Sequence, residues 1–322
     1  MTPKNGSLAR SEFELFMTFF LQTKNTMVYV VPVLKPSEKD PSASMLIAEL
    51  LKQAGLPDGV FNVVPGLGEI AGKALGLSND VDLAAFTGST SVGKEFLRYS
   101  ADSNMKRIIL ECGGKSPQIV MPDAIKDIAS VTNELINAAF WNTGQNCTAG
   151  SRILVHESIR EEVVASLVTA ASEISVGDPS LPATRLGPVI EPEAMERILR
   201  YIKEGSADGA TVETGGEQVL KESGGWFVPP TILNNVQPSM SVAREEIFGP
   251  VVSILGFSSE AEAIKIANDS EYGLAASVFT HDLDSAHRMA RAVRAGTVSV
   301  NCYSEGSIAT PFGGYKSSGF GG

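Results

Sequence analysis

The chain has 322 residues, of which 43% are hydrophobic and 20% charged, and its 31 glycines fit an α/β enzyme better than a fibrous or coiled-coil protein. A formal net charge of −11 gives a nucleic-acid partner no electrostatic help. No apolar run approaches the roughly 18 residues of a membrane span, so neither nucleic acid nor membrane is expected as a partner. The odd number of cysteines, three, and the lack of a recognisable signal peptide favour a cytoplasmic protein without disulfides.

The first part of the chain alternates short β-branched runs with amphipathic stretches, which is typical of a parallel sheet covered by helices. Residues 1–26 fit neither period and form an atypical N-terminal segment. The pattern then predicts strand 28–34, helix 42–54 capped by Asp40 or Ser42, strand 60–64, helix 69–77, strand 83–86, turn 87–91, helix 92–100 and strand 107–111. This spacing suits crossover units and predicts a dinucleotide-binding domain over residues 27–112.

After Gly113-Gly114 the alternation repeats on a larger scale. We expect strand 118–121, helix 125–139, strand 152–155, helices 158–175 and 193–204, and further strand and helix alternations up to Val300. Residues 113–322 are therefore predicted to form a second α/β domain.

Two glycine-rich turns lie where a predicted strand meets a predicted helix. In the turn from Gly88 to Lys94, backbone N–H groups could cradle phosphate oxygens. A nucleotide triphosphatase would need Ser or Thr after Lys94, but Glu95 stands there, so that activity survives only if Mg²⁺ is held without the usual hydroxyl. The turn from Gly66 to Gly72 is similar to a dinucleotide fingerprint. Tight packing of strand on helix explains both sets of glycines almost as well.

Two residues stand out as candidates for chemistry. Cys147 lies in a small, polar, glycine-rich loop, where a thiolate could be stabilised, although most lone cysteines are inert core residues. Glu111 ends an apolar strand, where partial burial would raise its pKa and make it a plausible base. The alternative for Glu111 is a salt bridge with Lys106 or Lys115 at the strand end.

The three histidines give little evidence for a metal site or a catalytic pair. His281 and His287 are six residues apart and share no helix face, so no metal site is predicted. His156, nine residues after Cys147, leaves a cysteine-protease pair possible but unsupported.

Six ordered motifs together resemble the aldehyde dehydrogenase superfamily over residues 27–322. They are Leu34-Lys-Pro-Ser-Glu38, Phe86-Thr-Gly-Ser-Thr90, Leu110-Glu-Cys-Gly-Gly-Lys115, Gly144-Gln-Asn-Cys147, Arg244-Glu-Glu-Ile-Phe-Gly-Pro250 and Pro311-Phe-Gly-Gly-Tyr-Lys316. Within the superfamily the chain most resembles the branch that oxidises γ-glutamyl-γ-aminobutyraldehyde and similar ω-amino or aliphatic aldehydes. The implied fold is α/β, with an incomplete Rossmann-like cofactor domain and a second, catalytic α/β domain.

The resemblance implies NAD-dependent oxidation of a small-molecule aldehyde to a carboxylic acid. Cys147 would be the nucleophile that forms a thiohemiacetal and then a thioester. Glu111 would activate the water that hydrolyses this thioester.

The resemblance also assigns cofactor-binding residues. Lys35 and Glu38 would hold the adenosine ribose, Gly68 the adenine, Gly88, Ser89 and Gly93 the pyrophosphate, Glu246 the nicotinamide ribose and Phe248 the nicotinamide ring. Glu38 favours NAD over NADP, because a carboxylate repels a 2′-phosphate.

Compared with the family, the chain looks truncated at both ends. Family members carry an earlier strand with an asparagine of the oxyanion hole, whose loss typically lowers turnover about 10²–10³-fold. They also carry, beyond the position of Gly322, a strand that crosses the interface of a homo-oligomer. We therefore expect impaired activity, and the alternative is a catalytically silent dinucleotide-binding or interaction module derived from the enzyme.

Overall fold

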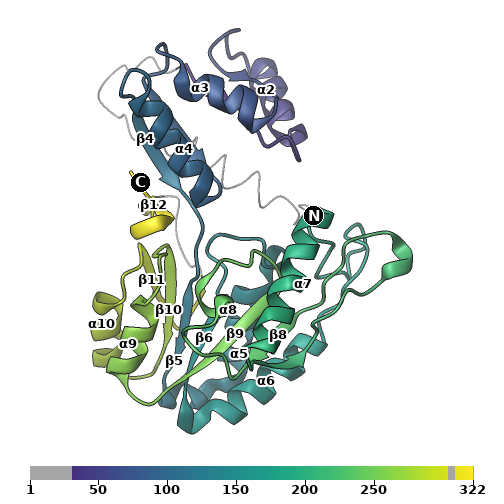
Figure 1. Ribbon diagram of the computed structural model, residues 1–322, viewed down its shortest axis with the longest axis vertical. Coiled ribbons are helices and arrows are strands. Elements are labelled where there is room, and N and C mark those ends of the chain that lie inside the picture. The colour runs from purple at the N-terminus through teal and green to yellow at the C-terminus, as the bar shows by residue number, and fades with distance from the viewer. Residues whose placement is uncertain (1–30, 304–308, 322) are drawn as a thin grey trace. The chain divides into compact units, whose positions relative to one another are not determined.

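The computed structural model describes residues 31–303 and 309–321 (Figure 1). They form two units, of which the first holds the chain up to Leu110 and the second begins at Glu111. The atypical segment 1–26 lies outside the described residues. Strands and helices alternate in both units, so the predicted α/β class is confirmed.

The first unit contains two separate pairs of strands where the sequence predicts one parallel sheet. Its elements are β1 (Val33–Leu34), α2 (Ser42–Gln53), β2 (Asn62–Val63), the π-helical turn η1 (Gly68–Gly72), α3 (Lys73–Leu77), β3 (Leu83–Thr87), α4 (Thr90–Ala101) and β4 (Arg107–Glu111). Strands β1 and β2 pair in parallel, and β3 and β4 lie in a different sheet. Pro32 cannot donate to the β1–β2 ladder and only accepts a bond from the Asn62 N–H, which helps to keep this pair short.

Two helix starts in this unit differ from the prediction. Pro41 occupies the N-cap of α2 without a side-chain bond, so the predicted cap at Asp40 or Ser42 was wrong. Helix α4 begins at Thr90, earlier than predicted, because the Ser89 hydroxyl accepts the Val92 N–H and caps the first turn.

The second unit is built on a seven-stranded sheet in the order β11-β10-β5-β6-β9-β8-β7. Its strands are β5 (Pro117–Val120), β6 (Arg152–His156), β7 (Thr211–Thr214), β8 (Thr231–Asn234), β9 (Val251–Phe257), β10 (Ala275–Phe279) and β11 (Thr297–Val300). All neighbours pair in parallel except β7, which runs antiparallel to β8 at the edge.

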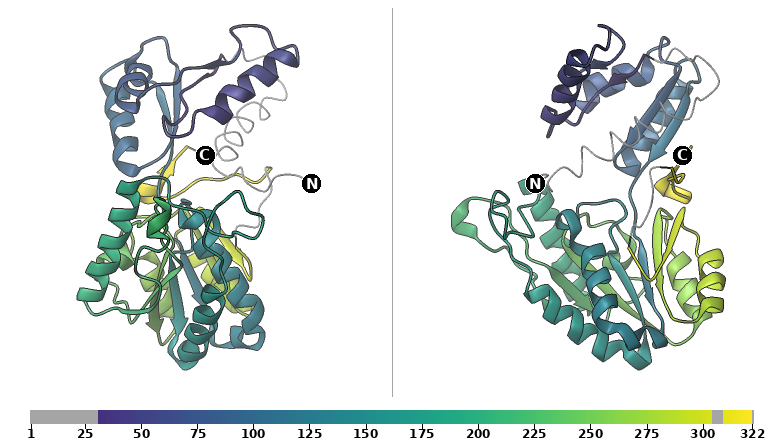
Figure 2. Two further views of the ribbon diagram at one scale, coloured as in Figure 1. Left: turned by 90° about the vertical axis from the view of Figure 1, so that its right-hand side faces the viewer. Right: turned by 180° about the vertical axis from the view of Figure 1, so that it is seen from behind.

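Helices cover both faces of this sheet (Figures 1 and 2). The long ones are α5 (Ile128–Phe140), α6 (Arg160–Ser172), α7 (Pro192–Ala207), α9 (Glu260–Asn268) and α10 (Leu283–Ala292). The shorter elements are α8 (Ser241–Arg244), the 3₁₀ turns η2 (Pro122–Asp127), η3 (Trp141–Gly144), η4 (Glu157–Ile159), η5 (Lys221–Ser223) and η6 (Lys316–Ser318), and strand β12 (Gly319–Phe320). Turns η2 and η4 take up the first residues of two helices that the sequence predicts as continuous.

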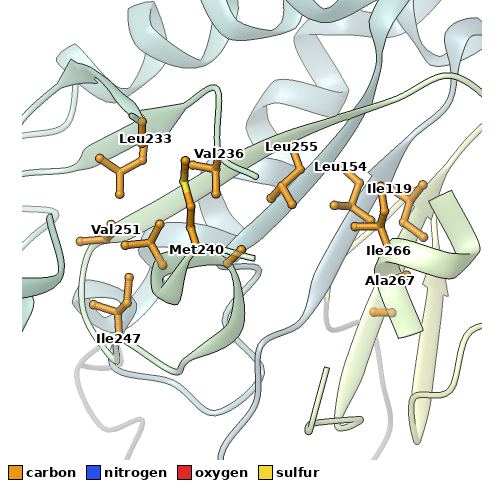
Figure 3. Close-up of a cluster of buried hydrophobic side chains, with 14 of the residues drawn as sticks. Ile119, Leu154, Leu233, Val236, Met240, Ile247, Val251, Leu255, Ile266 and Ala267 are labelled. Atoms are coloured by element: carbon orange, nitrogen blue, oxygen red, sulfur yellow. The ribbon is translucent and has the colours of Figure 1, made fainter. Parts of the chain in front are cut away.

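Two hydrophobic clusters fill the space between sheet and helices. One joins α7, α9 and α10 to strands that include β6 through Leu154, and part of it is drawn in Figure 3. The other joins α5 and α6 to the same sheet, to which β6 contributes Ile153 and Val155. Successive residues of a strand point to opposite faces, so β6 contributes to both clusters.

None of the described helices is both long and apolar enough to span a bilayer.

Replacing Leu154 by alanine should destabilise the second unit by about 2–5 kcal/mol, because it opens a cavity at a fully buried position. The matched change Leu181→Ala, at a leucine that is 57% exposed, should cost less than about 0.5 kcal/mol. Urea denaturation of both variants, followed by circular dichroism, measures the difference. Equal losses would contradict the core position of Leu154.

Candidate active site

Glu111, Cys147 and Glu246 lie on three segments that lead into neighbouring strands of the second unit. Glu111 comes before β5, Cys147 before β6 and Glu246 before β9, and these strands are adjacent and parallel. The loops that lead into these strands therefore meet at the amino-terminal ends of the strands. The sequence places Glu111 at the carboxyl end of a strand, which holds for β4, but the cluster as a whole lies at the opposite end of the larger sheet.

Two glycines let these segments touch. The Gly114 N–H donates to Glu246 Oε1 over 2.9 Å. A Cβ atom on Gly113 would lie 2.1 Å from Glu246 Oε2, and one on Gly114 would lie 2.3 Å from the carbonyl oxygen of Cys147. Any side chain at these positions would push the segments apart.

The turn that leads from α5 to Cys147 has an unusual backbone. Asn142, Thr143 and Gly144 follow one another with φ values of 52°, 58° and 67°. Phe248, on the segment before β9, also has a positive φ of 54°. Left-handed residues other than glycine are costly and cluster at functional sites. A Cβ atom on Gly144 would lie 2.2 Å from the carbonyl oxygen of Gly249, so the two strained turns are in contact.

The thiol of Cys147 is held in its protonated form. Burial raises its pKa to about 11, with further contributions from the negative charges of Glu246 and Glu111. Hydrogen bonds from the backbone N–H groups of Cys147 and Thr148 oppose this but are smaller. The expectation that the polar loop stabilises a thiolate was therefore wrong, because two carboxylates and the lost hydration outweigh the backbone donors.

Glu111 is buried with both carboxylate oxygens lacking a hydrogen-bond partner among the described residues. Burial raises its pKa to about 7. The alternative of a strand-end salt bridge was wrong. Lys106 Nζ donates instead to the Gly76 carbonyl and to Ser103, and Lys115 Nζ is buried without a partner in the described part of the chain. Glu111 is thus a carboxyl group that can gain or lose a proton near neutrality.

Glu246, the third member of this cluster, and the neighbouring Lys115 are also largely buried. Burial raises the pKa of Glu246, and this is opposed by the Gly114 N–H and the positive charge of Lys115. Burial lowers the pKa of Lys115 to about 7. The sequence singles out Lys115 as a member of a motif and as a possible salt-bridge partner of Glu111, but no local signal predicts its burial.

In the first unit, Lys35 and Glu38 form an ion pair with 2.8 Å between Nζ and Oε2, which lowers the pKa of Glu38. A Cβ atom on Gly72 would lie 4.0 Å from Lys35 Cδ, so this pair is next to the turn η1. A Cβ atom on Gly68 would meet nothing within 4 Å, which leaves open space there.

The other glycine-rich turn has a packing reason as well. A Cβ atom on Gly88 would lie 2.5 Å from the ring of Phe86, and Gly93 is buried in α4. The Ser89 hydroxyl accepts a hydrogen bond from the Val92 N–H and shares another with Ser91 Oγ, 3.0 Å away. What this turn offers to an anion is therefore the N-terminal end of a twelve-residue helix.

His156 does not pair with Cys147. Its Nδ1 lies 2.8 Å from Ser158 Oγ and its Nε2 lies 3.2 Å from the carbonyl oxygen of Ser258. The cysteine-protease alternative was wrong. Within residues 31–303 and 309–321, no group of three or more His, Cys, Asp or Glu side chains could hold a metal ion.

Replacing Glu111 by glutamine should lower the pKa of Cys147. Glu111 ionises near pH 7, so at higher pH its negative charge opposes formation of the thiolate, and its removal should speed alkylation by iodoacetamide at pH 8–9. The measurement is the rate of Cys147 alkylation against pH, followed on the tryptic peptide. Glu173→Gln, at an exposed site, is the matched control, and a slower reaction in the Glu111 variant would contradict the assigned interaction.

Comparisons with known proteins agree on one family. Residues 21–322 match the model of the aldehyde dehydrogenase family. Aminoacetaldehyde dehydrogenase of Pseudomonas aeruginosa is 46% identical over 90% of this chain and 58% of its own length. For the NADP/NAD-dependent aldehyde dehydrogenase PuuC of Escherichia coli the values are 47%, 90% and 57%.

Solved structures give the same result. An indole-3-acetaldehyde dehydrogenase in complex with NAD⁺ is 49% identical with a TM-score of 0.88, over 90% of this chain and 58% of that one. A γ-glutamyl-γ-aminobutyraldehyde dehydrogenase from Burkholderia cenocepacia is 50% identical with a TM-score of 0.87 and the same coverage. The chain spans somewhat more than half the length of these relatives. It belongs to the aldehyde dehydrogenase family.

Proposed function

We propose that this chain oxidises an aldehyde to the carboxylic acid, with NAD⁺ as the hydride acceptor and Cys147 and Glu111 as catalytic residues. The observation that carries the proposal is the pair of buried Glu111 oxygens that have no hydrogen-bond partner among the described residues, on the segment before β5, next to the strand β6 that follows Cys147. A carboxylate held in this way is available to take a proton from water. The names of the relatives, aminoacetaldehyde and γ-glutamyl-γ-aminobutyraldehyde dehydrogenases, support an ω-amino or aliphatic aldehyde as substrate.

In the first half of the reaction, the proton of Cys147 passes to solvent and the sulfur adds to the aldehyde carbon. With a pKa of about 11, only about 10⁻⁴ of the thiol is ionised at pH 7 before ligands bind. NAD⁺, when bound, would supply a positive charge near the sulfur and an acceptor for the hydride that leaves the substrate carbon. The product of this half is a thioester on Cys147.

In the second half, Glu111 removes a proton from water as the water oxygen attacks the thioester carbon. The tetrahedral adduct then expels the sulfur of Cys147 and releases the carboxylic acid. A base with a pKa of about 7 suits this task, because it is ionised at neutral pH and still basic enough to assist. Aldehyde, NAD⁺ and water are consumed, and acid, NADH and one proton are formed.

Residues of the first unit fit the adenosine half of NAD. The ionised Glu38, held by Lys35, would accept bonds from the ribose hydroxyls, and the open space at Gly68 would admit the adenine. Gly88, Ser89 and Gly93 would place the pyrophosphate at the start of α4. The carboxylate of Glu38 favours NAD over NADP.

Residues of the second unit would take the other half of the cofactor. Glu246 would bind the nicotinamide ribose, with Phe248 beside the ring. On this proposal the first unit is the dinucleotide-binding domain and the second the catalytic domain of a cytoplasmic enzyme. Two named complexes support the cofactor, since indole-3-acetaldehyde dehydrogenase and an aldehyde dehydrogenase from Bacillus cereus are described with NAD⁺.

Turnover is tested by following NADH absorbance with purified protein, NAD⁺ and a short aliphatic or ω-amino aldehyde. We expect activity in the unaltered chain and none in Cys147→Ala, because the thioester intermediate cannot form without the sulfur of Cys147. Binding of NAD⁺ without turnover would overturn the proposal in favour of the catalytically silent module.

Glu111→Gln should separate the two halves of the reaction. Without the base, a burst of NADH close to one equivalent should remain, while steady-state turnover falls about 10²–10⁴-fold. In the unaltered chain, hydrolysis should rise with pH to a plateau above pH 7, since the ionised form of Glu111 is the active one. Stopped-flow absorbance measures both phases, and Glu173→Gln is the control. Loss of the burst would assign Glu111 to the first half instead.

A further inference from the structure

Three polar groups form a hydrogen-bonded triangle beside Cys147. Asn146 Nδ2 donates to the Tyr303 hydroxyl over 2.7 Å and to Thr148 Oγ1 over 2.9 Å. Thr148 Oγ1 and the Tyr303 hydroxyl are 3.0 Å apart. Asn146 and Thr148 are the residues on either side of Cys147, so the Tyr303 hydroxyl is hydrogen-bonded to both sequence neighbours of Cys147.

Tyr303 is itself anchored to a different element. Its backbone N–H donates to Glu134 Oε2 over 2.8 Å, and Glu134 lies on α5. Helix α5 is the helix that leads through the strained turn to Cys147. The tyrosine therefore connects the nucleophile loop to the helix from which that loop departs. Burial raises the pKa of the phenol, so it keeps its proton at neutral pH.

The triangle fixes which end of the Asn146 amide faces the thiol. With Nδ2 engaged by Tyr303 and Thr148, Oδ1 points toward Cys147, and Sγ lies 3.9 Å from it in a weak S–H···O contact. An oxygen acceptor next to sulfur favours the thiol, whereas an amide turned the other way would offer N–H donors to the thiolate.

We propose that Tyr303 is a positioning residue for Cys147, whose hydroxyl holds the Asn146 amide oxygen toward the sulfur and thereby orders the loop and keeps the nucleophile protonated. Its meaning for catalysis rests on the proposed function, but its effect on the thiol can be measured without turnover. The other titratable groups that act on Cys147 are Glu111 and Glu246, and neither takes part in the triangle.

The test is the rate of Cys147 alkylation by iodoacetamide against pH, read on the tryptic peptide. In Tyr303→Phe, the freed amide can turn an N–H toward the thiolate, so the midpoint of the profile should fall by about half a pH unit or more. Tyr99→Phe, in the first unit, is the matched control and should leave the midpoint unchanged. An unchanged midpoint in Tyr303→Phe would overturn the proposal.

A second background shows whether the effect passes through Asn146. In Asn146→Ala, adding Tyr303→Phe should cause no further shift, because the amide that the hydroxyl orients is gone. A further shift of the same size would assign Tyr303 a role that bypasses Asn146 and overturn the proposal. If Tyr303→Phe does not fold by circular dichroism, Thr148→Val takes its place and should lower the midpoint by a smaller amount, and no shift there would overturn the proposal.

Turnover keeps this inference separate from the proposed function. If the protein binds NAD⁺ but oxidises no aldehyde, the proposed function is wrong, and the alkylation rates still test the role of Tyr303 independently. An active protein with unshifted labelling in Tyr303→Phe rejects only the role of Tyr303.

Discussion

The contact of the Gly113-Gly114 pair with two other segments is the constraint on which the site depends. Glu246 and the backbone of Cys147 both approach this pair more closely than any side chain would allow. Because Glu111 comes just before the pair, its carboxyl group lies on a segment that is fixed against both partners. The proposed chemistry of the site thus depends on the lack of a side chain at Gly113 and Gly114 as much as on the acidic side chains themselves.

Burial of like charges explains the electrostatics of the site. Glu111, Glu246 and the Cys147 thiol are all acids, and burial raises the pKa of each, while the negative charges of Glu246 and Glu111 raise the pKa of Cys147 further. Lys115 is the opposing charge, but its own pKa is lowered by burial. Glu111 therefore keeps part of its proton at neutral pH, and binding of a cation next to it would release that proton.

Much of the fold follows from the sequence pattern alone. Strand 107–111 is predicted with its observed limits, because Arg107 and Glu111 bracket an apolar run. Strand β6 is one residue longer than predicted, and α2 one residue shorter. The pattern could not show that the first unit splits its strands into two pairs, since pairing depends on contacts between residues far apart in sequence.

The site is predicted less completely for the same reason. Cys147 and Glu111 stand out by their local context, but the raised pKa of the thiol comes from carboxylates on other segments. Tyr303 follows Cys147 by more than 150 residues, and nothing around it in the sequence points to a bond with Asn146. The local pattern thus singles out Cys147 and Glu111 as candidates but does not reveal the groups that surround them.

The pairing of strand β6 also limits where Cys147 can lie. Its alternate side chains enter two separate clusters, and both of its edges are paired, to β5 and to β9. A slip of one residue along the strand would exchange the two faces and expel apolar groups from both layers, while carrying the chain about 3.3 Å along its axis. Cys147 lies five residues before β6 begins, so the pairing and packing that fix the register of β6 also fix how far along the strand axis Cys147 lies.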